Sequence, residues 1–186
     1  MSSDPIAPAA GTFVLLPGRH HCVTRFQVDY LRGLVEGTVT CDDGAAAGDG
    51  AQVVWAVTSA SHAHTRRDPI SGPRRVGLIE RVSAVEALSS LVVTIPDVPA
   101  HPRFAQLVLT TAATELGVDL TVENTVVACS TPAVAEEYAA LGYRIASVEA
   151  SRTPHAPRPW DVVERCAAGE PTWEQLAHPE TVSYWH

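Results

Sequence analysis

Short apolar runs and amphipathic segments alternate along the chain, and this alternation constrains the fold more than any other feature of the sequence. Apolar runs predict buried strands at 12–16, 53–57, 91–95, 125–128 and 144–148. Helical spacing predicts helices at 24–36, 74–88, 104–116, 132–141 and 160–168, then short helices at 172–176 and 179–185. Such alternation is typical of a parallel sheet with helices on both faces. The sequence therefore predicts an α/β fold with a doubly wound parallel sheet of about five strands.

The length of 186 residues fits one domain. We expect a disordered lead over 1–10 and a single α/β domain over 11–186, in which about 158–186 forms a small helical appendage. No apolar run approaches the roughly 20 residues of a membrane span, and the first ten residues lack the features of a secretory signal. None of the four cysteines belongs to a CxxC pair, so no zinc or redox motif is indicated. We expect a cytoplasmic protein with reduced thiols and no membrane partner.

The charged residues limit the partners of the chain. A net charge of −8 argues against bulk binding to nucleic acid. All 13 basic residues are arginine, which excludes mechanisms that require a lysine, such as Walker-type phosphate loops and Schiff-base chemistry. Arginine can still bind phosphate with bidentate geometry. The composition is therefore compatible with a small phosphate-bearing ligand and argues against a nucleic-acid partner.

The loop after the first predicted strand is rich in groups that bind anions. Parallel sheets place their ligands beyond the carboxyl ends of the strands. Gly18 lets the backbone approach a ligand closely, and the helix N-terminus that follows attracts phosphate. Arg19, His20, His21 and Thr24 lie around this point. We expect an anion pocket; the alternatives are an exposed polar loop with a helix N-cap, or a metal site, although adjacent histidines do not share one face.

The loop after the second predicted strand concentrates histidine, arginine and hydroxyl side chains. The candidates there are Ser59, His64, Thr65, Arg66 and Arg67. Arg75 follows at the start of the next predicted helix, where its positive charge opposes the helix dipole unless an anion is bound. The alternative is a solvated loop whose arginines pair with surface acids.

Two further segments carry candidate residues. Ser130 and Thr131 lie between the fourth predicted strand and its helix, where capping alone also explains them. Arg158 and Trp160 open the C-terminal helical part, from which Arg158 could reach back over the site.

These loops resemble the motifs of archaeal-type nicotinamide mononucleotide adenylyltransferases, within the HIGH-motif nucleotidyltransferase superfamily. The first family motif, GRFxPxHxGH, corresponds here to GRHHCVTRFQ over 18–27, in which Thr24 and Gln27 replace the two motif histidines. The C-terminal motif, Ser-Gly-Thr-x-Ile-Arg, corresponds to RPWDVV over 158–163, in which Val163 replaces the arginine.

Other parts of the chain extend the resemblance from about residue 13 to 185. Ser59-Ala60, His64-Thr65 and Asp68-Pro69 match the second family motif, and CSTP over 129–132 stands for Ser-Gly-Asn-Pro. The resemblance implies a Rossmann-like fold and a nucleotidyltransferase. Such an enzyme would pass a nucleotidyl group, most naturally adenylyl, from a triphosphate with Mg²⁺ to a phosphate-bearing small molecule such as a mononucleotide.

The resemblance also assigns roles. Thr24 and Gln27 occupy the positions of the catalytic histidines, and His20, His21, Arg25 or Arg158 could supply the charge that Gln27 lacks. The residues expected to bind nucleotide or phosphate are Gly18, Arg19, Ser59, His64, Thr65, Arg66, Arg67, Arg75, Ser130, Thr131 and Arg158. Phe104 and Trp160 would line the acceptor pocket, and no metal site is expected from side chains alone.

Two other functions stay open. The altered transfer motif beside retained phosphate loops would also suit an enzyme that cleaves a dinucleotide such as NAD. Phe26, Gln27 and Val163 favour a non-catalytic nucleotide-binding protein. Family members are commonly oligomers, so a homo-oligomer is an expectation from the resemblance alone.

Overall fold

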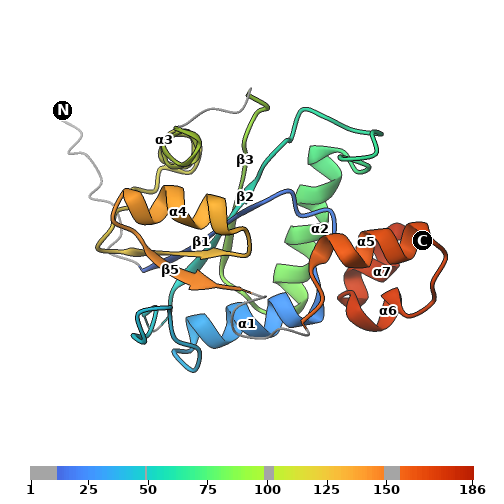
Figure 1. Cartoon of the computed structure of the whole chain (residues 1–186), viewed down its shortest axis with the longest axis horizontal. Helices are drawn as coiled ribbons and strands as arrows, with labels where there is room; N and C mark the ends of the chain where they lie inside the picture. Colours follow the sequence, from blue (N-terminus) through green and yellow to red (C-terminus); the bar gives the residue numbers. More distant parts are fainter. Residues whose placement is uncertain (1–11, 49, 99–102, 149–155) are drawn as a thin grey trace, which may run out of the picture.

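The computed structural model of the protein describes residues 12–48, 50–98, 103–148 and 156–186. A five-stranded parallel sheet runs through these residues in the order β3-β2-β1-β4-β5 (Figure 1). The strands are β1 (Phe13–Gly18), β2 (Gln52–Val57), β3 (Ser90–Thr94), β4 (Thr125–Cys129) and β5 (Arg144–Ser147). The predicted doubly wound α/β fold is confirmed. The predicted disordered lead at 1–10 lies outside the described residues.

Helices cover both faces of the sheet. One face carries α1 (Arg25–Val35) and α2 (Gly72–Val85), and the other carries α3 (Phe104–Leu116) and α4 (Pro132–Ala140). The C-terminal end consists of α5 (Pro159–Ala167), α6 (Trp173–Leu176) and α7 (Pro179–Trp185), which lie beside α2 (Figure 1). Within the described ranges, no helix is long and apolar enough to cross a membrane.

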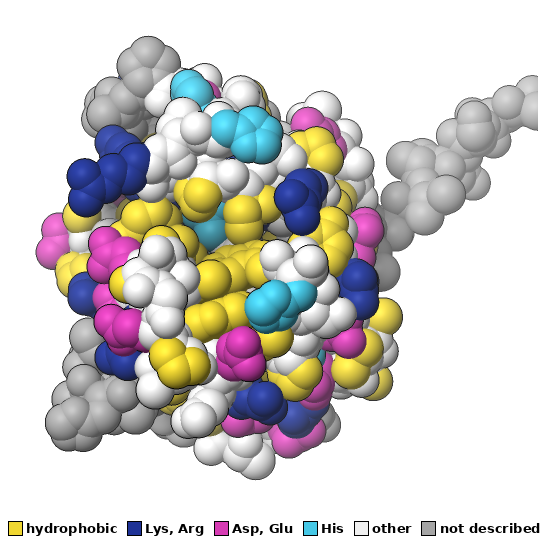
Figure 2. All heavy atoms as spheres, turned by 90° about the vertical axis from the view of Figure 1, so that its right-hand side faces the viewer, with side chains coloured by type: hydrophobic (Ala, Val, Ile, Leu, Met, Phe, Trp, Pro, Cys, Tyr) yellow, Lys and Arg dark blue, Asp and Glu magenta, His cyan; other side chains and the backbone are white. Residues whose placement is uncertain are grey.

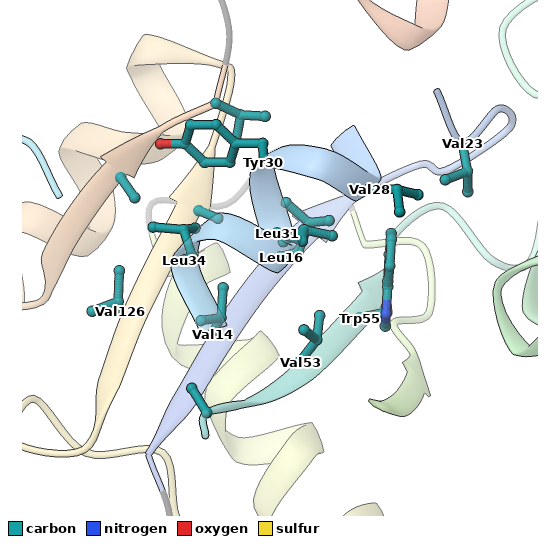
Figure 3. Close-up of a cluster of buried hydrophobic side chains, with 14 of the residues drawn as sticks. Val14, Leu16, Val23, Val28, Tyr30, Leu31, Leu34, Val53, Trp55 and Val126 are labelled. Carbon is teal, nitrogen blue, oxygen red and sulfur yellow. The ribbon is translucent and has the colours of Figure 1, made fainter. Parts of the chain in front are cut away.

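Alternate residues of the central strands enter two different cores. Val14 and Leu16 of β1 and Val53 and Trp55 of β2 face α1 and α2 (Figure 3). Leu15 of β1 enters the opposite core, with α3 and α4. Each of these side chains is at most 4% exposed, and burying one of this size contributes roughly 1.5–3 kcal/mol. Burial on both faces explains why the strands are continuous apolar runs instead of alternating ones.

The start of α2 lies unusually close to the loop after β2. The helix begins at Gly72, two residues before the predicted 74, because Ser71 takes the extended N-cap conformation and Pro73 is accepted in the first turn. A Cβ atom at Gly72 would lie 2.5 Å from the carbonyl oxygen of Ala60. Glycine is therefore required here for the close approach of two backbones.

Arg75 of α2 is fully buried and binds the main chain of the loops that follow β1 and β2. Its guanidinium donates to the carbonyl oxygens of Arg19 at 2.7 Å, Thr58 at 2.8 Å and Ser59 at 2.7 Å. Bonds from a charged donor are strong, and a planar guanidinium can make several at once. This placement corrects the sequence prediction of a phosphate-binding Arg75, because carbonyls already engage both terminal nitrogens.

The C-terminal helices are tied to the loop after β1. The Thr181 hydroxyl accepts from the Val23 N–H at 3.3 Å and donates to the Val23 carbonyl at 2.9 Å. The His178 N–H donates to the same carbonyl at 2.9 Å. The His178 ring also contacts Glu86 at the end of α2, and that hydrogen bond, followed by one from Arg32, lowers the pKa of the Glu86 carboxyl. These bonds hold the appendage where α5 can close one side of a cavity.

Replacing Arg75 by lysine should lower the free energy of unfolding by about 2–4 kcal/mol, because an ammonium cannot satisfy three diverging carbonyls. Chemical denaturation followed by tryptophan fluorescence measures the change. Arg81→Lys is the matched control in the same helix: Arg81 is half exposed and pairs with Glu180. The control should lose less than about 0.5 kcal/mol. Equal losses in the two variants would contradict the structural role of Arg75.

Candidate functional site

A cavity of about 680 Å³ lies at the carboxyl ends of β1 and β4. The helix after β1 covers one face of the sheet and the helix after β4 covers the other, so the strand order reverses at this point. Open α/β sheets bind ligands where the order reverses, because the two loops diverge there. The cavity walls come from the loop after β1 and from the N-termini of α4 and α5. Fold geometry alone therefore selects this cavity as the candidate site.

The cavity brings together many of the predicted site residues. Those that line it are Gly18, Arg19, His20, His21, Gln27, Arg67, Ser130, Thr131, Arg158 and Trp160. Cys22, Val148, Asp161 and Glu164 line it too, and the sequence analysis missed them. Asp161 and Glu164 are three residues apart and so lie on one side of α5, and this spacing could have revealed them.

The N-termini of α4 and α5 both meet the cavity. In the described part of the chain, neither N-cap side chain, Thr131 or Arg158, makes a capping hydrogen bond. The first turn of α5 contains Asp161, whereas that of α4 contains no acidic residue in the same description. Uncapped N–H groups and the helix dipole attract anions. The α4 end is therefore the more favourable place for a phosphate group.

His20 is buried and neutral at pH 7. Its Nε2 lies 3.1 Å from the carbonyl oxygen of Leu16 and therefore donates its proton to that oxygen. The ring packs edge-on against Trp55, with the ring centroids 5.3 Å apart. Burial lowers the pKa of His20 to about 4, and the Leu16 hydrogen bond only partly opposes this. His20 thus brings no positive charge to the cavity, which corrects the sequence expectation.

His21 pairs with Asp68, but it too is neutral. Its Nε2 lies 3.3 Å from Asp68 Oδ1, and the two side chains are 2% and 12% exposed. Burial and then the charge of Arg75 lower the pKa of His21 to about 4, outweighing the carboxylate. The Thr65 hydroxyl accepts from the Asp68 N–H at 2.9 Å. Thr65 therefore shapes the turn that holds Asp68, where the sequence predicted a phosphate contact.

Thr24 and Gln27 form a capping box at the start of α1. The Gln27 N–H donates to Thr24 Oγ1 and the Thr24 N–H donates to Gln27 Oε1, each at 3.1 Å. Thr24 is fully buried and lies outside the cavity, and Gln27 lines the cavity with its oxygen engaged in the cap. Capping therefore replaces the catalytic role expected for Thr24, but it uses only the side-chain oxygen of Gln27 and not the amide nitrogen, which is the expected donor. The spacing Thr-x-x-Gln is itself a helix-start signature that the sequence contains.

Arginine side chains supply the positive charge of the cavity. Arg19 and Arg67 come from neighbouring loops, and Arg19 donates to the Arg67 carbonyl at 3.1 Å. Arg158 makes two 3.1 Å hydrogen bonds to the Asp161 carboxylate, which balances its charge locally. Glu164 adds a second carboxylate from α5. The cavity is therefore cationic on the side of the loops after β1 and β2 and more acidic on the side of α5.

The remaining predicted site residues lie outside the cavity as the described residues define it. They are Ser59, His64, Thr65, Arg66, Arg75 and Phe104, together with the capping residue Thr24. Ser59 and His64 have left-handed φ angles of 52° and 58°, so they set the course of the loop. Phe104 is the first residue of α3, after the edge strand β3, and it is partly buried against the core on that face of the sheet. It does not line the acceptor pocket that the sequence predicted.

A second hollow, of about 280 Å³, lies between the loop after β2 and the C-terminal helices. Its walls are mostly apolar and include Ile70, Val163 and Trp185. Figure 2 shows the side of the molecule formed by these helices, where apolar side chains gather in a band bordered by charged ones. The larger cavity has more groups that could orient a polar ligand.

In the ranges that the structure describes, no group of three or more histidine, cysteine, aspartate or glutamate side chains could hold a metal ion. A Mg²⁺ ion here would therefore take most of its ligands from the phosphates of a bound nucleotide and from water.

No protein-family model matches the chain, and no curated protein matches it. The residues that line the cavity can hold an anion at the N-terminus of α4 and present the Trp160 ring to a planar group. With both histidines neutral, the site favours electrostatic stabilisation by arginine over proton donation by imidazolium.

The buried neutral state of His20 should make stability depend on pH. The imidazole has a pKa near 6.5 when unfolded and about 4 when folded, so the unfolded chain binds more protons between these values. The free energy of unfolding should therefore fall as the pH drops from about 6.5 to 4, by about 3 kcal/mol for this side chain. His20→Asn, which tolerates the φ of 55°, should reduce this dependence in denaturation curves measured from pH 7 to 4.5, and the part due to the buried His21 should remain.

His64→Asn is the matched control for this measurement. His64 has a similar φ of 58° but is exposed, so its ring is hydrated in the folded and the unfolded chain alike. The control should keep the wild-type slope. An unchanged slope in His20→Asn would show that His20 is not held neutral by burial.

Proposed function

We propose that the protein binds a nucleoside triphosphate in the cavity and transfers its nucleotidyl group to a phosphate-bearing small molecule. The observation that supports this most directly is the convergence of the uncapped N-terminus of α4 with Arg19 and Arg67 at the point of strand-order reversal. Nucleotides bind at such points, with their phosphates on a helix N-terminus. A cavity of about 680 Å³ lies within the size range of small-molecule sites.

The cationic side of the cavity would hold the phosphates. Arg19 and Arg67 can each offer planar N–H donors to phosphate oxygens, and the first turn of α4 adds main-chain N–H groups. The α5 side, with Trp160 and two carboxylates, suits a neutral or hydroxyl-bearing part of a ligand. The polarity of the cavity therefore orients a nucleotide with its phosphates away from α5.

Transfer between phosphates matches the neutral histidines. An oxygen of the acceptor phosphate attacks the α-phosphorus of the triphosphate and forms a new P–O bond. The bond from the α-phosphorus to the oxygen that bridges to the β-phosphorus breaks, and pyrophosphate leaves with the electron pair. A phosphate nucleophile is already ionised, so no histidine base is needed, and catalysis rests on positioning and charge stabilisation. Mg²⁺ bound with the triphosphate would neutralise part of its charge.

The resemblance to archaeal-type nicotinamide mononucleotide adenylyltransferases supports an adenylyl donor and a mononucleotide acceptor within this proposal. A homo-oligomer is a further prediction that follows from the same resemblance, and the cytoplasmic location expected from the sequence stays a prediction.

Incubation with ATP, CTP, NMN and NAD in the presence of Mg²⁺, singly and in pairs, tests the reaction when products are identified by mass spectrometry. A new dinucleotide together with pyrophosphate is the expected result and names both substrates. Loss of NAD without an added triphosphate, with formation of NMN and AMP, would show that the protein cleaves a dinucleotide and does not transfer a nucleotidyl group. Nucleotide binding in a thermal-shift assay without any turnover would instead indicate a binding protein.

Arg67→Ala should weaken triphosphate binding about 10- to 100-fold, because a charge-assisted hydrogen bond to phosphate is lost. Isothermal titration calorimetry gives the Kd. Arg66→Ala is the matched control, since Arg66 is the adjacent exposed arginine and lies outside the cavity in the described structure. Equal weakening in both variants would mean that only overall charge matters.

Thr131→Asp should separate stability from binding. A carboxylate at this uncapped N-cap should raise the free energy of unfolding by roughly 0.3–1 kcal/mol. The same charge would occupy the proposed phosphate position, so triphosphate affinity should fall at least about tenfold. Ser71→Asp adds the same group at the N-cap of α2, outside the cavity within the described ranges, and should leave affinity unchanged. Retained affinity in Thr131→Asp would exclude α4 as the phosphate site.

A further inference from the structure

Trp160 and Glu164 form a bonded pair on the α5 wall of the cavity. They lie four residues apart, and therefore on one side of the helix, and both line the cavity. The indole Nε1 of Trp160 donates a hydrogen bond to Glu164 Oε1 at 3.0 Å. An indole has no other donor, so this bond leaves Trp160 with only its ring to offer a ligand. The same bond holds one oxygen of the Glu164 carboxylate beside that ring.

The Trp160 ring is braced from a second side by His21. The two rings meet edge-on, with their centroids 6.2 Å apart and their planes at 64°. His21 is itself held in place, because its side chain is 2% exposed and its Nε2 contacts Asp68 at 3.3 Å. Trp160 is only partly buried, so part of its surface is accessible. A braced and accessible indole that lines a cavity is a suitable surface for a planar ring such as a nucleotide base.

The two carboxylates of the α5 wall differ in their hydrogen bonds. Asp161 accepts from Arg158 with both of its oxygens, each at 3.1 Å. Glu164 accepts from Trp160 with Oε1, and in the described part of the chain its Oε2 makes no hydrogen bond. The Glu164 side chain is exposed, so a ligand in the cavity can reach this second oxygen. Glu164 therefore offers an accessible anionic acceptor one helical turn from an aromatic ring.

An anionic acceptor on this wall favours one part of a nucleotide over another. A carboxylate repels phosphate, which carries the same sign of charge, and binds O–H and N–H donors. The phosphates of the proposed ligand would lie at Arg19, Arg67 and the N-terminus of α4. The nucleoside is the part left for α5, and it carries both a planar base and hydrogen-bond donors.

We propose that Glu164 is a specificity-determining residue, whose carboxylate accepts a hydrogen bond from the nucleoside of the bound triphosphate while the base lies against the Trp160 ring. The donor is a ribose hydroxyl or an amine of the base, since both present the same chemistry to a carboxylate. The inference rests on the proposed nucleotide site and deepens it, because it states which end of the ligand α5 recognises. A site that hydrogen-bonds a particular donor binds analogues without that donor more weakly.

Isothermal titration calorimetry first identifies the triphosphate that binds most tightly among ATP, CTP, GTP and UTP. The same measurement then compares it with its 2′-deoxy and 3′-deoxy forms and, where it carries an exocyclic amine, with the analogue that lacks this amine. Wild-type protein should bind at least one analogue about 5- to 50-fold more weakly than the parent, because a hydrogen bond to a charged group is lost. The analogue that binds weakly identifies the donor.

Glu164→Ala should bring the Kd values of the parent and of that analogue to within about twofold of each other, because the acceptor is gone. Comparing two ligands of equal charge cancels the general effect of removing a negative charge near phosphate. Glu170→Ala is the matched control, since Glu170 is exposed, pairs with Arg165 and lies outside the cavity within the described ranges. The control should keep the wild-type preference. Both glutamates are exposed, so both variants should fold.

Trp160→Phe tests the place of the base. Phenylalanine keeps an aromatic ring but has no N–H to hold Glu164, so this variant should lose part of the preference for the parent ligand. A base stacked on an indole quenches its fluorescence, so the triphosphate should quench wild-type protein more than Trp160→Phe. Equal quenching of the two proteins would overturn the place assigned to the base.

Failure of this inference is distinguishable from failure of the proposed function. If a triphosphate binds but wild-type protein treats all analogues alike, the role of Glu164 is wrong and the proposed function stands. The same conclusion holds if Glu164→Ala keeps the preference, or if Glu170→Ala loses it to the same extent. If none of the four triphosphates binds to wild-type protein, both the nucleotide site and the role of Glu164 are overturned.

Discussion

The buried guanidinium of Arg75 is the interaction on which the site depends. It crosses from α2 to the carbonyls of Arg19, Thr58 and Ser59, and so fixes the loops that leave β1 and β2 relative to each other. The N–H groups of this guanidinium donate hydrogen bonds, and its positive charge also acts on the titratable side chains nearby. Together with burial, it holds the His21 imidazole in the neutral form. Arg75 therefore fixes two loops beside the cavity, and its charge adds to the burial that keeps His20 and His21 neutral.

Neutral histidines change what the cavity can do. If the cavity holds phosphate as proposed, Arg19, Arg67 and the N-terminus of α4 are the groups that could stabilise its charge, because the histidines are neutral. The histidines instead contribute geometry. His20 braces the turn after β1 by binding the Leu16 carbonyl, and His21 pairs with Asp68. Such a site, in which arginine supplies the charge and neutral histidines support the loops, suits the proposed phosphate transfer, because that reaction depends more on positioning than on proton transfer.

The C-terminal helices complete the cavity from a distant part of the sequence. Thr181 and His178 both bond the main chain of Val23, a residue of the loop after β1. This docking brings Trp160 and the α5 carboxylates to the wall of the cavity. The asymmetry of charge across the cavity, and hence the direction in which a nucleotide would lie, comes from the contact between the two ends of the chain.

Local periodicity in the sequence specifies the strands and helices of the layered fold, and the range predicted for α3 agrees residue for residue. The sequence also located the loops around Gly18, Ser130 and Arg158, since every parallel strand ends at the same edge of the sheet. It misplaced Arg75, Thr65 and Phe104, because a side chain's surroundings depend on residues far away in the chain. Which polar side chains line the cavity and which bind the backbone instead depends on the tertiary structure, because most buried donors and acceptors find partners from distant parts of the chain.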